Sequence, residues 1–262
     1  MVILREAEVC VSGDVLFSAI ERIQGSQPWG TVLDAGTGQH SLKWICGLRT
    51  SGWTAVTGGD ARRRDLTKAL AGRIRDQDRL LTGNWKDPEF CRGKVFDTVV
   101  ADYLLGALDG FAPYFQTELF GRLRPHVGRR LYVVGLDPYP DVSVDPGGQM
   151  VLDIARLRDA CILLAGHRCY REYPMEWTVQ QLKQQGFRIV EATRFPIVYR
   201  ERFVNGQLDV CARKLPYFQD QSLAAQMEKT IANTRKRAVR LVRGAGGIPF
   251  GTDYVVAADP IR

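Results

Sequence analysis

The sequence predicts a doubly wound α/β fold: a mostly parallel, seven-stranded sheet with helices on both faces and a helical cap. Short apolar runs alternate with amphipathic segments between Trp29 and Asp137. Several of these runs are apolar throughout, which is typical of parallel strands that are buried on both faces. After Asp137 the rhythm changes, because a Pro- and Gly-rich segment leads into longer helical patterns that we interpret as a cap.

The predicted strands are short apolar runs that stop at Gly, Asp, Asn or Pro. In chain order we expect them at residues 31–34, 53–57, 79–82, 94–101, 130–136, 188–197 and 253–258. The last of these would be the closing, antiparallel strand.

The predicted helices carry apolar residues at intervals of three and four. Leu66, Leu70 and Ile74, for example, share one face of a charged segment. We expect helices at residues 15–23, 41–49, 62–76, 113–123, 150–165, 177–185 and 219–243.

Composition is that of an ordinary soluble protein, with 262 residues, 45% hydrophobic and 25% charged. No stretch approaches the ~18 apolar residues of a membrane span. The first residues do not follow the order of a secretory signal, so we expect a cytoplasmic or nuclear protein without membrane association. Six scattered cysteines lack zinc-ligand spacing, so no metal site is predicted. The net charge of +7 permits an acidic partner without requiring one.

The stretch from Thr31 to Leu42 carries the first chemical signal. A buried strand delivers Asp34 to its carboxyl end, and Gly36 and Gly38 then allow a tight turn before a helix. The free N–H groups of a helix start face such a turn, which favours a ligand with a carboxylate, a phosphate or sugar hydroxyls.

Two further polar sites follow the next strands. Asp60 comes about 20 residues after the turn, where an acid accepts hydrogen bonds from the hydroxyls of a ribose. Asn84 and Trp85 follow the third strand. Because ligands of open parallel sheets bind beyond the carboxyl ends of the strands, an adenosine-bearing cofactor is indicated.

The glycine spacing distinguishes among such cofactors. A dinucleotide fingerprint needs a third glycine where His40 stands, and no Gly-Lys-Ser or Gly-Lys-Thr is present to hold a triphosphate. The run from Val32 to Gly38 instead resembles the first motif of the class I S-adenosylmethionine-dependent methyltransferases. The resemblance extends to Gly58-Gly59-Asp60, to Gly83-Asn84-Trp85 and to the fourth-strand run from Phe96 to Asp102, and it covers residues 29–198.

The resemblance implies S-adenosylmethionine as cofactor. The residues that would contact it are Asp34, Ala35, Gly36, Thr37, Gly38, Asp60, Ala61, Asn84, Trp85 and Asp102. Trp85 would lie beside the adenine, although a place in the core explains it equally well. His40 is either an ordinary residue of the first helical turn or a base, and the sequence does not decide between these roles.

Methyl transfer from a sulfonium depends mainly on placing the nucleophile in line, and a base is needed only where the attacking atom carries a proton. Asp102 and Tyr103 are the candidate catalytic residues, with Asp102 alternatively holding the amino group of the cofactor. The fourth-strand motif lacks the prolines of enzymes that modify bases or amides. It also lacks the acids and prolines of the aminopropyl transferases, which share the fold.

We expect a single domain over residues 1–262, with residues 28–137 as the cofactor-binding half and insertions 138–187 and 199–250 as cap. A small acceptor, methylated on O or N, would be held by residues that follow the fifth strand. These candidates are Asp137, Arg158, Tyr170, Arg171 and Tyr173, and ion pairs that fix the cap to the core are the alternative role for the arginines.

Two other functions stay open. The basic cluster from Arg235 to Arg243 would dock an RNA or protein acceptor, or it is simply a solvated helix face. Alternatively, the chain is a binding subunit that has the cofactor fold without catalysis. The oligomeric state is not predicted.

Overall fold

The computed structural model describes residues 4–6, by backbone alone, and residues 14–261. The chain divides into two compact units. The first runs to Asp137 and includes Arg171–Phe195 and the residues from Asp253 onward, and the second consists of Pro138–Tyr170 and Pro196–Thr252. Of the expected first insertion, residues 138–170 therefore belong to the second unit and residues 171–187 to the first.

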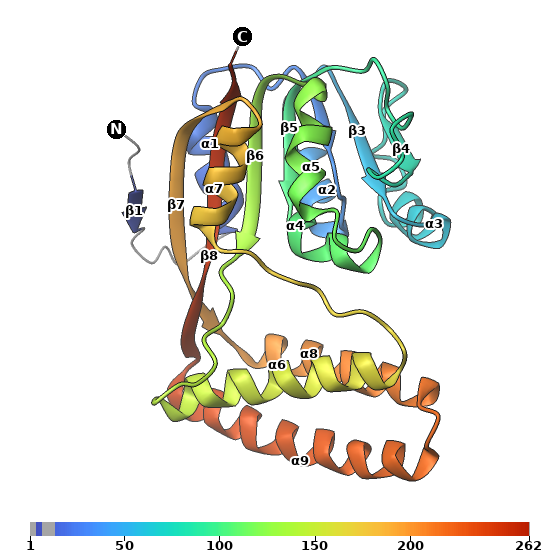
Figure 1. Ribbon diagram of the computed structural model, residues 1–262, viewed down its shortest axis with the longest axis vertical. Helices are drawn as coiled ribbons and strands as arrows, with labels where there is room; N and C mark the ends of the chain where they lie inside the picture. The colour runs from blue at the N-terminus through green and yellow to red at the C-terminus, as the bar shows by residue number, and fades with distance from the viewer. Residues whose placement is uncertain (1–3, 7–13, 262) are drawn as a thin grey trace. The chain divides into compact units, whose positions relative to one another are not determined.

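The first unit is built on one eight-stranded sheet (Figure 1). Its order is β1-β7-β8-β6-β5-β2-β3-β4. The strands are β1 (Leu4–Glu6), β2 (Thr31–Asp34), β3 (Gly52–Thr57), β4 (Arg79–Thr82), β5 (Phe96–Asp102), β6 (Val127–Leu136), β7 (Phe187–Tyr199) and β8 (Ile248–Pro260). β8 runs antiparallel to β6, whereas β2 pairs in parallel with β3 and β5. The predicted doubly wound, mostly parallel sheet is confirmed, and β1 is an additional strand that pairs with β7.

The helices are α1 (Val15–Gln24), α2 (Gln39–Ile45), α3 (Asp60–Ala69), α4 (Leu104–Ala107), α5 (Gln116–Leu123), α6 (Pro146–Leu164), α7 (Met175–Gln184), α8 (Glu201–Lys214) and α9 (Gln221–Ala245). Helix α3 ends before the predicted Asp76, because the chain turns after Leu70 and Gly72 takes the left-handed conformation. The prediction missed α4 and α8. Helix α6 begins earlier than predicted, where Asp145 caps its N-terminus and Pro146 takes the first position.

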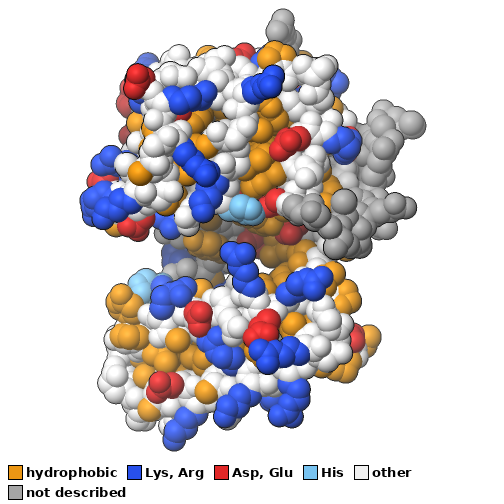
Figure 2. All heavy atoms as spheres, turned by 180° about the vertical axis from the view of Figure 1, so that it is seen from behind, with side chains coloured by type: hydrophobic (Ala, Val, Ile, Leu, Met, Phe, Trp, Pro, Cys, Tyr) orange, Lys and Arg blue, Asp and Glu red, His pale blue; other side chains and the backbone are white. Residues whose placement is uncertain are grey.

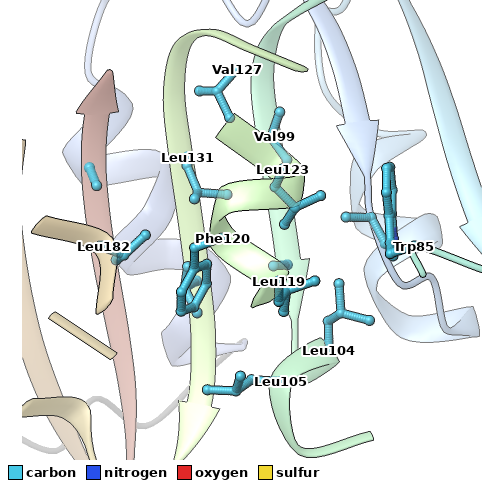
Figure 3. Packing of buried hydrophobic residues seen from close by; sticks show 14 of the residues in the cluster. Trp85, Val99, Leu104, Leu105, Leu119, Phe120, Leu123, Val127, Leu131 and Leu182 are labelled. Carbon is cyan, nitrogen blue, oxygen red and sulfur yellow. The ribbon is translucent and has the colours of Figure 1, made fainter. Parts of the chain in front are cut away.

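Both faces of the sheet are covered. On one face, Leu119, Phe120 and Leu123 of α5 pack against Val99 and Leu131 of the central strands (Figure 3). On the other face, α1 packs on β6 and β8, and α2 and α3 pack on β2 and β3. This double coverage explains the unbroken apolar runs Val99–Ala101 in β5 and Leu131–Val134 in β6.

The second unit is a layer of three helices, α6, α8 and α9, with a core of its own. Ile154 of α6, Leu208 of α8 and Ala238 of α9 are fully buried in it. Among the helices that the structure describes, none combines the length and the apolar character that a membrane crossing needs.

Candidate active site

The glycine turn after β2 is held by hydrogen bonds to both neighbouring strands. The Ala35 amide donates to the Val100 carbonyl at 2.8 Å, and the Thr37 amide donates to the Val56 carbonyl at 2.7 Å. A side chain at Gly36 would meet Leu104 Cδ1 at 2.6 Å, so this glycine is needed for packing. Gly38 caps α2, and a Cβ there would have no atom within 4 Å. The surface above Gly38 is therefore open.

Asp34 ends β2 beneath this turn and is fully buried. Among the described residues, neither of its carboxylate oxygens has a hydrogen-bond partner of normal geometry. Burial raises the pKa of Asp34 to about 6, and the nearby Thr37 and Ser41 hydroxyls offset part of that rise. A buried carboxyl without a partner costs folding free energy, which is the pattern of a group that serves a ligand.

Asp102 ends β5, the strand beside β2, at the place where the strand order reverses. Burial first, and then the charges of Asp34, Asp14 and Asp253, raise the pKa of Asp102 to about 7. Crevices at such reversals are the usual ligand sites of open α/β sheets. Two carboxyls that are costly to ionise thus flank the reversal.

A pocket of about 370 Å³ opens next to Asp102. Its lining residues come from α1 with its cap, from α2, from the end of β5 and from the middle of β8: Asp14, Val15, Leu16, Phe17, His40, Asp102, Tyr103 and Asp253. Tyr103 has a left-handed backbone at φ 47°, an uncommon conformation for a bulky residue. Its hydroxyl donates to the Asp253 carboxylate, and burial together with that neighbouring charge raises the pKa of Tyr103. A raised pKa keeps the phenol protonated, which suits a hydrogen-bond donor better than a base.

Asp60 begins α3 at the carboxyl end of β3, and its side chain is 63% exposed. It accepts hydrogen bonds from the Thr82 hydroxyl at 2.7 Å and from Arg63 Nε at 3.2 Å. The Thr82 hydrogen bond, followed by that of Arg63, lowers the pKa of Asp60. Ala61 follows it on the exposed first turn of α3. An ionised, accessible carboxylate at this strand end matches the predicted ribose contact.

Asn84 and Trp85 differ in what they offer to a ligand. Asn84 is exposed, but its amide donates to the Phe111 carbonyl and its oxygen accepts from the Lys86 amide. Trp85 is 2% exposed and donates from Nε1 to the Ala35 carbonyl at 2.6 Å. Of its two predicted roles, the structure agrees with the place in the core. The indole supports the glycine turn from beneath.

The chain is similar to known proteins in its three-dimensional structure and not in its sequence. No family model and no curated protein sequence matches the chain. Solved structures do match along most of its length. A candidate methyltransferase from Bacillus halodurans superposes with a TM-score of 0.61 at 12% identity, covering 95% of this chain and 100% of its own. The chain has the class I methyltransferase fold.

Two other solved structures with this fold are named for reactions other than simple methyl transfer. The mycolic acid cyclopropane synthase CmaA1, determined with SAH and CTAB, has a TM-score of 0.52 at 16% identity and covers 92% of this chain and 83% of its own. The [4+2]-cyclase SpnF has a TM-score of 0.54 at 11% identity, covering 94% and 80%. The methyltransferase fold therefore does not fix the reaction by itself.

The predicted acceptor residues are divided between the two units. In the first unit, Asp137 accepts from the Met175 amide at 3.0 Å and from Arg194 Nε at 2.7 Å, which fixes the start of α7. Tyr173 packs on the Trp177 ring, and Arg171 is exposed, with its backbone amide bonded to the Gly106 carbonyl.

The other two acceptor candidates belong to the second unit. Arg158 of α6 pairs with Asp159 at 2.7 Å and donates to Gln207 of α8 at 2.9 Å, so its guanidinium joins helices of that unit. Both partners lie within the second unit, whereas the predicted alternative was an ion pair between cap and core. Tyr170 is 57% exposed.

The basic cluster of α9 is partly engaged in its own unit. Arg235 pairs with Asp209 at 2.8 Å, and Arg243 pairs with Glu201 at the same distance. Figure 2 shows the Lys and Arg side chains of this unit dispersed among acidic and apolar ones over the visible face. The arrangement is that of a solvated, ion-paired helix face.

Sequence reasoning missed two of the polar groups in the pocket, Asp14 and Asp253, and left His40 unexplained. Asp14 could have been found as a helix cap, because an Asp directly before an apolar helical pattern is a cap signal. It accepts from the Leu16 amide at 2.9 Å. Asp253 stands at the start of a predicted strand, and nothing in its local sequence signals a pocket.

Proposed function

We propose that this chain is an S-adenosylmethionine-dependent methyltransferase that acts on an O or N atom of a small-molecule acceptor. The observation that carries the proposal is the uncompensated carboxyl of Asp34 at the strand-order reversal, beneath a glycine turn whose outer surface is open. The fold supports the same conclusion, and so does the complex of CmaA1 with SAH, which is S-adenosylhomocysteine.

The proposed cofactor site follows the strand ends from β2 to β5. The turn from Asp34 to Gly38 would receive the methionine end, with Asp102 accepting hydrogen bonds from its amino group. Asp60 would hold the ribose hydroxyls, and Ala61 and Asn84 would lie beside the adenine. Trp85 takes no direct part in this proposal, because its ring is buried. When bound, the cofactor supplies an activated methyl group, and the protein supplies placement.

The acceptor would enter the pocket of about 370 Å³ beside Asp102, a volume that suits a small molecule. Tyr103 lines this pocket and would orient the acceptor through its fixed hydroxyl. Tyr170 and Arg171 remain proposed acceptor contacts. Arg158, Asp137 and Tyr173 are withdrawn from that role because their polar groups or rings are used within their own units.

Binding of the cofactor tests the proposal directly. Calorimetry should detect both S-adenosylmethionine and S-adenosylhomocysteine on the wild-type protein. Gly38→Ala should weaken both by about tenfold or more, since its methyl group would occupy the open surface above the turn. Its backbone, at φ −111° and ψ 176°, accepts alanine without strain. The matched control is Gly206→Ala in α8, where a Cβ also meets nothing within 4 Å.

Transfer is then measured with methyl-labelled cofactor and a panel of small phenols, carboxylic acids and amines. Failure to bind either form of the cofactor would overturn the proposal. Binding without transfer to any small molecule, RNA or protein would assign the chain to the non-catalytic binding class instead. Transfer to RNA that is lost in Arg240→Ala would favour the macromolecular acceptor.

A further inference from the structure

His40 lies in the first turn of α2 and lines the same pocket as Asp102 and Tyr103. Its Nε2 is 3.2 Å from Asp14 Oδ2, and its side chain is 74% exposed. Among the described residues, Asp14 is the charged partner of this imidazole. The two residues are far apart in sequence and meet at the mouth of one pocket.

Asp14 is itself fixed in place. Its Oδ1 accepts from the Leu16 and Phe17 amides at the start of α1, which leaves Oδ2 for His40. The imidazole also packs edge-on against the Phe17 ring, with centroids 5.2 Å apart, and Phe17 stacks on Trp44 at 4.3 Å. The ring is therefore held by its contact with the Asp14 carboxylate and by an aromatic contact, although it is open to solvent.

The contact with Asp14 also selects a tautomer. A lone pair on Nε2 would face the carboxylate oxygen at 3.2 Å, so a neutral imidazole is favoured with its proton on Nε2 and its lone pair on Nδ1, where it accepts a proton. A base that is oriented by a carboxylate is a recurrent arrangement in enzymes.

The other polar groups of the pocket are engaged under the proposed function. Asp253 accepts from the Tyr103 hydroxyl, and Asp14 is occupied by the helix cap and by His40. Asp102 would accept from the amino group of the cofactor. These groups, from α1, β5 and β8, are the titratable side chains that line the pocket with His40. Of the lining groups that the structure describes, His40 is then the one with an available proton-accepting atom.

We propose that His40, oriented by Asp14, is the general base of the transfer, and that the acceptor therefore attacks through an O–H or N–H group that still carries its proton. This inference rests on the proposed function, because it concerns the same site. In the step, the acceptor oxygen or nitrogen forms a bond to the methyl carbon as the bond from that carbon to sulfur breaks. The electron pair of that bond remains on sulfur. The acceptor proton passes to His40 Nδ1 and from there to solvent.

The first test needs no turnover. Long-range ¹H–¹⁵N NMR of the free protein reports which imidazole nitrogen carries the proton, and His40→Gln identifies the signal among the three histidines. We expect the Nε2–H form at pH 8. Asp14→Asn should weaken that preference while it preserves the cap, because Asn caps helices as well as Asp does. A wild-type imidazole with the proton on Nδ1 would overturn the proposal.

The second test uses an acceptor that the wild-type protein methylates. His40→Gln should lower kcat by about 10²- to 10⁴-fold and remove the acidic limb of the pH–rate profile. The dissociation constant of S-adenosylmethionine should stay within about twofold of the wild-type value, well below the tenfold that 1.4 kcal/mol represents. His167→Gln in the second unit is the control and should change neither quantity.

The outcomes separate the two proposals. If the wild-type protein binds no cofactor, the proposed function fails, and the NMR measurement still decides whether the His40–Asp14 pair exists. If the cofactor binds and His40→Gln keeps the wild-type kcat and pH profile, the base assignment is overturned while the methyltransferase stands. An acidic limb that disappears instead in Asp102→Asn would assign the base to that carboxyl.

Discussion

Replacing Asp34 by Asn should make the ligand-free protein less dependent on pH. The pKa of Asp34 rises from 3.8 in the unfolded chain to about 6 in the folded protein. The folded state therefore binds more protons than the unfolded state between these values, and this carboxyl lowers stability as the pH rises through that window. A shift of about two units at 1.36 kcal/mol each corresponds to about 3 kcal/mol, fully present above pH 7.

The amide that Asp34→Asn introduces does not ionise, so this loss should disappear. Burying the amide costs about 1–3 kcal/mol at every pH, which makes the variant less stable than wild type near pH 4. At pH 8 the two should be similar, or the variant more stable. The quantity to measure is the difference in unfolding free energy between variant and wild type, which should change by about 2.5 kcal/mol in favour of the variant from pH 4 to pH 8, because about 0.5 kcal/mol of the effect is already present at pH 4.

Urea denaturation followed by tryptophan fluorescence suits this experiment. All the tryptophans lie in the first unit, so the signal reports its unfolding alone: Trp29, Trp44, Trp53, Trp85 and Trp177. The same variant should bind S-adenosylmethionine at least about tenfold more weakly. If the unfolding free energies of Asp34→Asn and wild type ran parallel with pH, the reasoning about the buried carboxyl would be refuted. An unchanged affinity for S-adenosylmethionine would refute the link between Asp34 and the ligand.

Two further perturbations test other parts of the first unit. Arg75→Ala should lower the unfolding free energy by about 1–3 kcal/mol, because it removes the guanidinium that lies 2.8 Å from the buried Asp78 carboxylate, while the amides of Trp53 and residue 75 still donate to it. A loss below about 0.5 kcal/mol in the same urea experiment would contradict this. Tyr103→Phe should raise the pKa of Asp253 above its value of about 6, since the hydrogen bond from Tyr103 lowers that pKa. A ¹³C NMR titration of the Asp253 carboxyl measures the change. An unchanged or lower pKa would show that the hydrogen bond is unimportant.

The sheet was predictable because its strands are marked by local signals. The third predicted strand is found where expected, as β4 at Arg79–Thr82, since a short apolar run there is closed by Gly83. Helix α8 was missed because its burial depends on α6 and α9, whose positions the local sequence does not give. Helix α4 was missed because it starts from Tyr103, whose left-handed backbone no local pattern in the sequence indicates.

The site was predictable to the extent that it follows strand ends. Asp34, Asp60 and Asp102 stand where their strands stop, so their positions follow from the alternation of strand and helix. The pocket was not predictable, because Asp14 and Asp253 come to His40 and Asp102 from opposite ends of the chain. Trp85 also follows a strand, but that position in the sequence does not reveal that its ring is buried in the core instead of facing a ligand.

The acids of the first unit divide into two groups with different electrostatic environments. Asp78 and Asp259 each lie within 2.8 Å of an arginine, so their charges are compensated. Asp34, Asp102 and Asp253 instead have pKa values raised by burial, although the chain has a net charge of +7. Basic side chains are thus available in the protein, but among the described residues none of them pairs with these three carboxyls.

The uncompensated acids gather where the strand order reverses and around one pocket. Folding alone would favour apolar residues there, because a buried unpaired carboxyl costs free energy that a neighbouring arginine would offset. A ligand with positively charged groups would supply the missing compensation when it binds, and the sulfonium and amino group of S-adenosylmethionine are such groups. The affinity for that ligand should therefore rise with pH as Asp34 and Asp102 ionise, between about pH 5 and pH 8.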